Sequence, residues 1–382
     1  MLRQAEERDM RKIAGALGGL ALSAGAASAG DIERSTQSVG ILFEEGRYVE
    51  LTYGFVKPDV SGNIPNTPFQ SGNMAGNFST WSLAYKQALG SNMDIALVLD
   101  QPIGADVDYP GGIYPLAGTT AELRSNAVTA LLRYKFDNDV SLYGGLRAQS
   151  VKGKANILFD IYQEGSYVAT TDYNLETNTD YAFGYVVGVA WEKPEIAARV
   201  ALTYNSAIDH TLEADETGTN AVFGDRAGVS EFDTTVPQSV NLEFQTGIAP
   251  DTLLFGSVRW VDWTEFLIDP EIYQYYFPGI PLVAYESDRW TYTLGLGRRF
   301  TEKWSGAVTV SYEPKTGDDT GNLGPNDGFR SIGIGATYTH ENMKITGGIR
   351  YVELGSANTR GVGAKFDDNE ALAAGIRVGF TF

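Results

Sequence analysis

The last eleven residues of the chain, Leu372–Phe382, alternate between two kinds of side chain, and this pattern limits the possible folds more than any other. One set is small or polar, and the other is apolar: Leu372, Ala374, Ile376, Val378, Phe380 and Phe382. A period of two predicts a β-strand with one apolar face. About eleven residues is the length that a tilted strand needs to cross the hydrocarbon core of a bilayer. We therefore predict that this stretch, which ends on an aromatic residue, closes an outer-membrane β-barrel.

The same period recurs along the chain, and short and long connections between the alternating stretches follow each other strictly. Such alternation is typical of single-chain outer-membrane barrels, which have an even number of strands, short periplasmic turns and long outer loops. Soluble β-sandwiches have less regular connections. The sequence thus predicts an all-β protein, a transmembrane antiparallel barrel of about 14 strands. The predicted strands are 47–57, 81–85, 93–99, 128–136, 140–148, 181–191, 196–204, 240–244, 254–260, 290–296, 304–312, 332–338, 343–351 and 372–382.

The N-terminal region has the features of a secretory signal peptide. Arg11 and Lys12 precede an apolar run, and Ala27-Ser28-Ala29 is a small-residue cleavage site. Met1 and Met10 both remain possible starts. We predict a signal peptide at 1–29, a short hatch segment at 30–46 and the barrel at 47–382.

Composition excludes several classes of function. Removal of residues 1–29, which hold four basic and three acidic residues, changes the net charge from −19 to −20, which argues against a nucleic-acid partner. The absence of cysteine excludes thiolate chemistry. The two histidines, His210 and His340, have no Ser or Cys at a recognisable spacing, and no Gly-x-Ser-x-Gly or phosphate-binding loop occurs. We expect neither an enzyme nor a cofactor, and we interpret the acidic runs 317–319 and 367–370 as solvated loop surface.

The second phase of the strands contains charged residues that must face the lumen, because charge is costly in lipid. Two interpretations remain open: ion pairs that satisfy one another within the lumen, or arginines that guide an anionic head group. The residues concerned are Glu50, Asp94, Arg133, Lys135, Arg147, Arg199, Glu243, Arg259, Arg350 and Arg377.

Three segments resemble the FadL family of outer-membrane transporters for long-chain fatty acids and other hydrophobic compounds. Gly256–Phe266, which contains Trp260-Val261-Asp262-Trp263-Thr264-Glu265-Phe266, is similar to the family's Trp-x-x-Trp-[Ser/Thr]-x-Phe stretch. Asp100–Gly104 resembles its Pro-Phe-Gly segment, and Pro325–Arg330 resembles its Pro-Asp-x-x-Arg segment. The order of the three segments, which span most of the chain, is more specific than any one of them.

The resemblance implies a monomeric barrel that is plugged by an N-terminal hatch and passes its ligand by passive diffusion. It implies capture in the third and fourth outer loops, a pocket in the lumen and a lateral exit at a kink in the third strand. Pro102 and Gly104 lie where that kink is expected. The hatch is shorter than the family's and lacks its Asn-Pro-Ala tripeptide. The residues expected in the loops and the lumen are Phe159, Ile161, Tyr162, Tyr167, Val222 and Phe223, and Leu42, Phe43, Arg147 and Arg259, although 157–161 also fits the continuation of a strand.

We therefore expect an outer-membrane channel for long-chain fatty acids or similar hydrophobic compounds, in contact with outer-membrane lipid and lipopolysaccharide. A general or solute-selective porin is the main alternative, and it predicts an open polar lumen with ion conductance. An adhesive or structural barrel predicts neither uptake nor conductance. A lipid hydrolase lacks a catalytic constellation.

Overall fold

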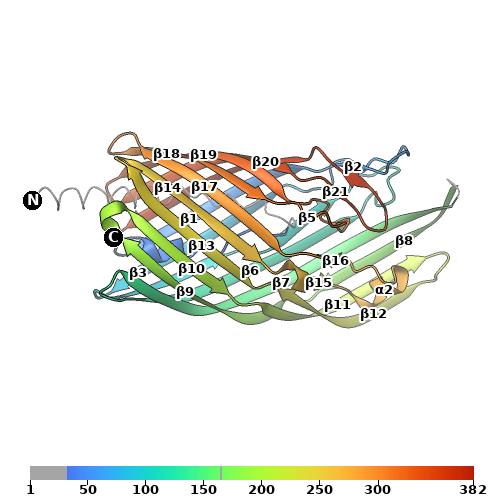
Figure 1. Ribbon diagram of the computed structural model, residues 1–382. Helices are drawn as coiled ribbons and strands as arrows, with labels where there is room; N and C mark the ends of the chain where they lie inside the picture. Colours follow the sequence, from blue (N-terminus) through green and yellow to red (C-terminus); the bar gives the residue numbers. More distant parts are fainter. Residues whose placement is uncertain (1–31, 164–165) are drawn as a thin grey trace, which may run out of the picture.

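The computed structural model describes residues 32–163 and 166–382, and these form a closed antiparallel barrel of 14 strands (Figure 1). The predicted signal peptide at 1–29 lies outside the described residues. No helix in the described part of the chain is long and apolar enough to cross a membrane. The strands of the barrel wall, in chain order, are β1 (Tyr48–Asp59), β3 (Phe78–Leu89), β4 (Met93–Asp100), β6 (Thr120–Lys135), β7 (Val140–Gln163), β9 (Asp180–Lys193), β10 (Ala198–Asn205), β13 (Ser239–Ala249), β14 (Thr252–Val261), β17 (Arg289–Arg299), β18 (Trp304–Glu313), β19 (Phe329–His340), β20 (Met343–Leu354) and β23 (Glu370–Thr381).

Four further strands continue members of the wall toward the long-loop end of the barrel. β5 (Gly104–Asp108) continues β4, and β8 (Ser166–Thr177) precedes β9 along the same partner, β7. β11 (Ile208–Asn220) and β12 (Arg226–Val236) continue β10 and β13 in the same way. Figure 1 shows the resulting extension of β7, β8, β11 and β12 at the end opposite to the C terminus.

The seam of the barrel confirms the prediction for the C-terminal strand. β1 and β23 pair without interruption from Tyr48↔Thr381 to Asp59↔Glu370. The apolar phase of the strands faces outward, as expected for contact with lipid: Leu146, Tyr181 and Phe183 are 69%, 73% and 76% exposed. Inside the barrel, polar side chains line one half of the lumen, and apolar loop residues fill the other half.

The list of predicted strands leaves 101–126, 149–180 and 205–235 as loops, and for these three stretches the prediction is wrong. They contain β5, the ends of β6 and β7, β8, β11 and β12. Residues 157–161 therefore belong to strand β7, as the alternative interpretation had it. In this extension the outward phase is hydrophilic instead of apolar. Asp209, Thr211 and Glu213 are exposed, whereas Ile208 and Leu212 are buried.

Short elements complete the structure in the loops and the hatch. They are η2 (Gly40–Phe43), η3 (Pro194–Ile196), η4 (Trp263–Glu265), α2 (Glu271–Tyr276), β2 (Gly62–Asn63), β15 (Leu267–Ile268), β16 (Val283–Ala284), β21 (Ala357–Asn358) and β22 (Lys365–Phe366). β2, β22 and β21 form a small sheet that joins the loop after β1 to the loop before β23.

Candidate functional site

The N-terminal segment lies inside the barrel, and its η2 turn packs against one side of the lumen. Ile41 and Leu42 are buried together with Val39. Their apolar partners come from strands β3, β4, β6, β7, β9 and β10: Ala84, Ala96, Leu131, Tyr143, Val186, Ala190 and Ala201. Burial of this kind contributes about 25 cal/mol per Å² of apolar surface. The short segment therefore occupies part of this half of the lumen despite its length.

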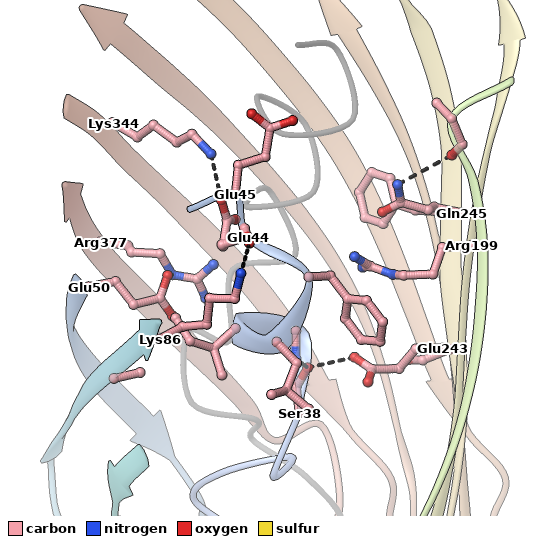
Figure 2. A pocket seen from close by; sticks show the side chains of 18 of the residues that line it. Ser38, Glu44, Glu45, Glu50, Lys86, Arg199, Glu243, Gln245, Lys344 and Arg377 are labelled. Carbon is pink, nitrogen blue, oxygen red and sulfur yellow. Dashed lines mark hydrogen bonds and ion pairs between the residues drawn. The ribbon is translucent and has the colours of Figure 1, made fainter. Parts of the chain in front are cut away.

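Positive side chains of the wall fasten the hatch. Arg133 and Arg199 both lie over the Phe43 ring, with their guanidinium carbons 4.5 and 4.3 Å from its centroid. Lys86 Nζ donates to the Glu44 carbonyl oxygen at 2.8 Å, and Lys344 Nζ lies 2.8 Å from the Glu44 carboxylate. Figure 2 shows Lys86, Arg199 and Lys344 pointing toward η2 and Glu44 from different strands. The contacts combine cation–π attraction with charged hydrogen bonds.

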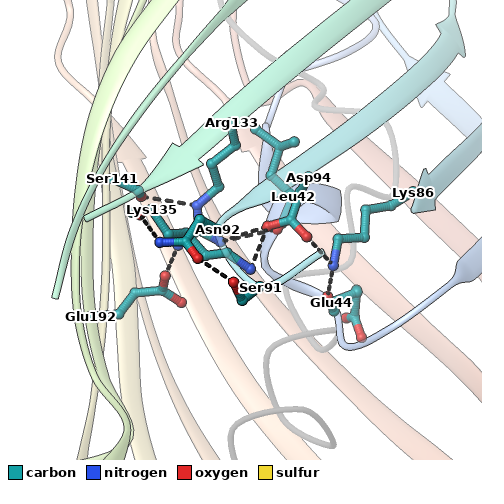
Figure 3. Close-up of polar contacts among 10 residues, drawn as sticks. All are labelled: Leu42, Glu44, Lys86, Ser91, Asn92, Asp94, Arg133, Lys135, Ser141 and Glu192. Atoms are coloured by element: carbon teal, nitrogen blue, oxygen red, sulfur yellow. Dashed lines mark hydrogen bonds and ion pairs between the residues drawn. The ribbon is translucent and has the colours of Figure 1, made fainter. Parts of the chain in front are cut away.

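A buried carboxylate organises the wall beside the hatch. Asp94 is 1% exposed and lies 2.9 Å from Lys86 Nζ, 3.1 Å from Lys135 Nζ and 3.9 Å from Arg133 Nη1 (Figure 3). Arg133 in turn contacts Glu192 and donates to the Leu42 carbonyl oxygen at 3.1 Å. The predicted ion pairs among lumen residues are therefore confirmed for this group.

A polar cavity of about 1600 Å³ occupies the rest of the lumen on this side. All the residues predicted to face the lumen line it, except Arg147, which is buried in the wall and donates to Thr129 Oγ1 at 2.8 Å. Both acidic and basic groups face the cavity, including Glu50, Arg199, Glu243 and Arg377 (Figure 2).

Residues 33–38, which we call the strap, lie within the lumen and bond to strands on two parts of the wall. Ser35 Oγ donates to Asp100 Oδ2 of β4 at 2.7 Å. Arg259 Nε of β14 donates to Glu33 Oε1 at 2.7 Å, and Ser38 Oγ donates to Glu243 Oε1 of β13 at 2.6 Å. Since both Glu33 and Arg259 are buried, their ion pair is shielded from solvent.

The wall is irregular at Pro102 and Gly104, the residues at which a kink is predicted. Between Asp100↔Ala127 and Gly104↔Arg124, three residues of the β4–β5 stretch oppose two of β6, which is the count of a β-bulge. The Ser125 hydroxyl bonds both the N–H and the carbonyl of Ile103, at 2.9 and 2.6 Å. Pro102 has no N–H for the ladder, so it fits this interruption.

On the side of the bulge that faces β3, the wall lacks a continuous hydrogen-bond ladder. The pairing of β3 with β4 ends at Leu83↔Leu99, and Phe78–Ser82 continue with β1 alone among their ladder partners. We call the space between Phe78–Ser82 and Gln101–Ala105 the lateral window. Residues 32–35 fill it: Arg34 N donates to Pro102 O at 2.8 Å, and Gly104 N donates to Ile32 O at 2.7 Å. The hatch segment thus pairs with the part of Gln101–Ala105 that β3 leaves unpaired.

The outer half of the lumen is filled by apolar side chains of the loops. Trp263, Phe266 and Phe366 are almost fully buried there, within a cluster that also includes residues of β1, β5, β7, β8 and β11. Tyr273 of α2 packs on Tyr173 and on Phe277. Burial raises the pKa of Tyr273, which therefore stays a neutral aromatic residue at physiological pH. Sequence reasoning missed this group because its members come from separate loops.

The predicted capture residues occupy different environments. Phe159 of β7 packs against Phe277 with ring centroids 5.6 Å apart. Ile161 and Tyr162 also lie on β7, and Tyr167 lies on β8 with its ring 6.2 Å from that of Tyr162. In contrast, Val222 and Phe223, in the turn between β11 and β12, are exposed. The structure therefore places Phe159 beneath the loops, and Val222 and Phe223 at the tip of another hairpin.

Glu216 of β11 fixes α2 against the extension of the barrel. Its buried carboxylate accepts hydrogen bonds from the backbone N–H groups of Ile272 and Tyr273, at 3.0 and 3.2 Å, and from the Tyr173 hydroxyl at 2.7 Å. Next along the strand, Gly218 leaves room for Tyr276, whose ring would lie 2.1 Å from a Cβ at that position.

We expect Gly218→Ala to displace α2, because the new methyl group overlaps the Tyr276 ring. The reaction rate of a maleimide with a single cysteine at Ile272 reports this movement, since the chain has no other cysteine. An increase of about tenfold is expected, equivalent to about 1.4 kcal/mol. Gly153→Ala is the matched control on β7, where the nearest atoms, Glu122 O and Leu123 Cδ1, are 3.8 Å away and lie far along the chain from the reporter position. Equal labelling rates in the two variants would contradict the overlap.

The fold and the site together define a class: an outer-membrane barrel whose lumen holds an N-terminal hatch and whose wall is interrupted in its third strand. The family model described as outer membrane protein transport protein (OMPP1/FadL/TodX) matches residues 11–375, and the chain belongs to this family. It is accordingly an outer-membrane protein from a family of hydrophobic-compound channels. The predicted family is confirmed.

Solved structures with the same fold share little sequence with this chain. A FadL homologue from Pseudomonas aeruginosa is 13% identical, with a TM-score of 0.74 over 90% of this chain and 92% of that one. The toluene transporter TbuX of Ralstonia pickettii is 14% identical, with a TM-score of 0.62 over 89% and 90%. The toluene transporter TodX of Pseudomonas putida is 10% identical, with a TM-score of 0.63 over 88% and 90%. No curated protein matches the chain by sequence.

Proposed function

We propose that this protein is a passive uptake channel for long-chain fatty acids or similar hydrophobic compounds. The observation that carries the proposal is the lateral window between Phe78–Ser82 and Gln101–Ala105, which lies next to apolar side chains in the outer half of the lumen. An interruption in the wall does not help transport through a water-filled pore. It does help transport of a ligand that prefers lipid, because such a ligand can leave sideways into the membrane without crossing the polar cavity.

The proposed path begins at the outer hairpins and ends at the window. Exposed apolar residues such as Val222, Phe223 and Tyr167 provide the first contact. Phe159, Ile161 and Tyr162 of β7 lead inward. Leu42 and Phe43 of η2 close the path toward the polar cavity. Arg147 and Arg259, both buried, place positive charge on its inner side, which attracts an anionic head group. Pro102 and Gly104 form the bulge at which the ligand leaves.

The same proposal includes the lipid surroundings. The exposed apolar belt, with Leu146, Tyr181 and Phe183, fits outer-membrane lipid. At the outer rim, the exposed cations Lys152 and Lys154 fit the phosphates of lipopolysaccharide. Since the 14 strands close on themselves, one chain is sufficient for the channel, and we propose a monomer.

A porin is the second candidate, and the polar cavity of about 1600 Å³ favours it. Two measurements separate the candidates. One is uptake of labelled oleate and labelled toluene by cells that lack their own transporter and express this protein. The other is ion conductance of the purified barrel in planar bilayers.

Saturable uptake of oleate with little conductance is the expected result, because apolar residues fill the outer half of the lumen. Uptake of toluene alone would shift the substrate class to small aromatic hydrocarbons. Large, steady conductance without uptake of either compound would overturn the proposal in favour of a porin.

A further inference from the structure

Asp106, on the edge of the lateral window, contacts two arginines that come from different parts of the molecule. Arg34 of the hatch lies 3.4 Å away, measured from Nη2 to Asp106 Oδ2. Arg124 of β6 contacts the other carboxylate oxygen, and its Nε lies 3.0 Å from Glu122. Exposure increases along the series: 7% for the Arg34 side chain, 20% for Asp106 and 44% for Arg124. The three groups therefore form a line of alternating charge from the interior of the wall to its surface.

The outer end of this line faces the surroundings of the barrel. Arg124 belongs to the exposed phase of β6, which continues with Val128 and Leu132, 42% and 46% exposed, toward the middle of the belt. Asp106 pairs directly with Glu122 in the same phase. A ligand that reaches Arg124 has therefore left the lumen and is beside the membrane.

The inner end of the line closes the window. The backbone of Arg34 is held by Pro102, as described above, and its guanidinium carbon lies 3.1 Å from the centroid of the Phe78 ring. On the opposite side it lies over Gly104, where a Cβ would be 3.3 Å from Arg34 Nε. The guanidinium thus fills the space between the outer end of β3 and β5. Gly104 leaves room for it, which gives this glycine a second role besides the bulge.

An apolar cavity adjoins the charged line. It has a volume of about 40 Å³ and is bounded by Arg34 and Asp106 at one side. The other lining side chains are mostly apolar and include Val56, Val60, Met74, Phe78, Val107 and Leu354. A charged end beside an apolar wall matches the chemistry of a carboxylate that carries a hydrocarbon chain. A neutral hydrocarbon would use the apolar wall alone.

We propose that Arg34, Asp106 and Arg124 form a head-group relay that makes the lateral window selective for carboxylated amphiphiles. This inference rests on the proposed function and names its substrate class. The ligand carboxylate takes the place of Asp106 on Arg34, which opens the window, and then moves to Arg124 on the lipid side. Arg34 contacts Asp106 through one Nη2–Oδ2 contact of 3.4 Å, and a ligand carboxylate can replace it with the same charge. A neutral molecule offers Arg34 no replacement for Asp106, and breaking a largely buried ion pair without replacement is costly.

The test compares two ligands that differ only in the head group. Uptake of labelled oleate and of labelled oleyl alcohol is measured in Arg34→Gln, Arg124→Gln and Asp106→Asn. Arg330→Gln is the matched control, because this exposed arginine of β19 pairs with Glu353 on another part of the rim. Migration of unheated samples in gel electrophoresis confirms that each barrel has folded.

We expect Arg34→Gln to lower oleate uptake by about tenfold, which corresponds to one strong charged hydrogen bond. Uptake of the alcohol should rise in the same variant, because the ion pair that closes the window to neutral molecules is absent. Arg124→Gln is expected to lower oleate uptake by about threefold. Asp106→Asn removes the competing carboxylate, so the half-saturating oleate concentration should fall. Since Arg124 is on the surface, oleate uptake by Arg124→Gln still tests the relay if Arg34→Gln does not fold.

Equal losses for oleate and the alcohol, or unchanged uptake of both, would overturn the relay and leave the channel function intact. A wild-type protein that takes up neither oleate, the alcohol nor toluene would overturn the proposed function and the relay with it.

Discussion

Replacement of Arg259 by methionine is expected to release residues 32–38 from the lumen. The substitution leaves the Glu33 carboxylate, which is 5% exposed, without its cation, and loss of one partner of a buried pair costs about 3 to 5 kcal/mol. The Asn241 side chain loses its 2.6 Å hydrogen bond from Arg259 at the same time. The barrel itself should remain closed, because its strand ladders do not depend on this pair.

Amide hydrogen exchange measures the release. The N–H groups of Arg34 and Gly104 bond across the lateral window, and their exchange should accelerate by about 100-fold or more in Arg259→Met. Two variants provide controls. Arg330→Met breaks an exposed pair and should cost no more than about 1 kcal/mol. Adding Glu33→Gln to Arg259→Met should restore much of the protection, since no charge is then buried alone. If protection is unchanged in the single variant, the strap is held by other contacts.

Deletion of Pro102 is expected to abolish lateral release. It makes the number of residues between Asp100 and Gly104 equal to the number between Arg124 and Ala127, so β4 and β5 can join as one regular strand. The carbonyl that holds Arg34 and Ser35 is lost as well. Oleate uptake should fall by about tenfold or more, while the barrel still folds.

Pro102→Ala is the control for this deletion, because it keeps the number of residues and hence the bulge. Its uptake should stay within about threefold of the wild-type value. Uptake by the deletion variant at the wild-type level would show that the bulge has no part in transport.

The period of two was sufficient to predict most of the barrel, because lipid on one side imposes an apolar phase on each strand. Leu372–Phe382 and the lumen position of Arg133 both follow from it. The same rule failed where the wall rises above the membrane. In β11, the buried residues Ile208, Leu212 and Ala214 alternate with Asp209, Thr211 and Glu213. The period is present, but the outer phase faces water, so the absence of an apolar outer phase predicts a loop where the structure has a strand.

The site could be predicted only in part, for a different reason. Leu42 and Phe43 stood out as apolar residues in a polar segment, and Pro102 and Gly104 stood out by their effect on a strand. Arg34 and Asp106 had no local signal. Their contact joins residues 72 positions apart and exists only because the hatch crosses a closed barrel. The apolar group around Trp263 and Tyr273 was missed because loop conformations decide which of its members meet.

The seam between β1 and β23 has a consequence for the order of assembly. It joins the first strand of the wall to the last, and such distant pairing is slow because a long loop of chain must be ordered first. The strap and η2 precede β1 and lie within the ring that the seam closes. The N-terminal segment must therefore be laid against β4, β6 and β7 while the sheet is still open, or be threaded afterwards past Lys344 and Arg377. Closure of the seam and placement of the N-terminal segment are therefore linked steps of assembly, because the closed ring surrounds that segment.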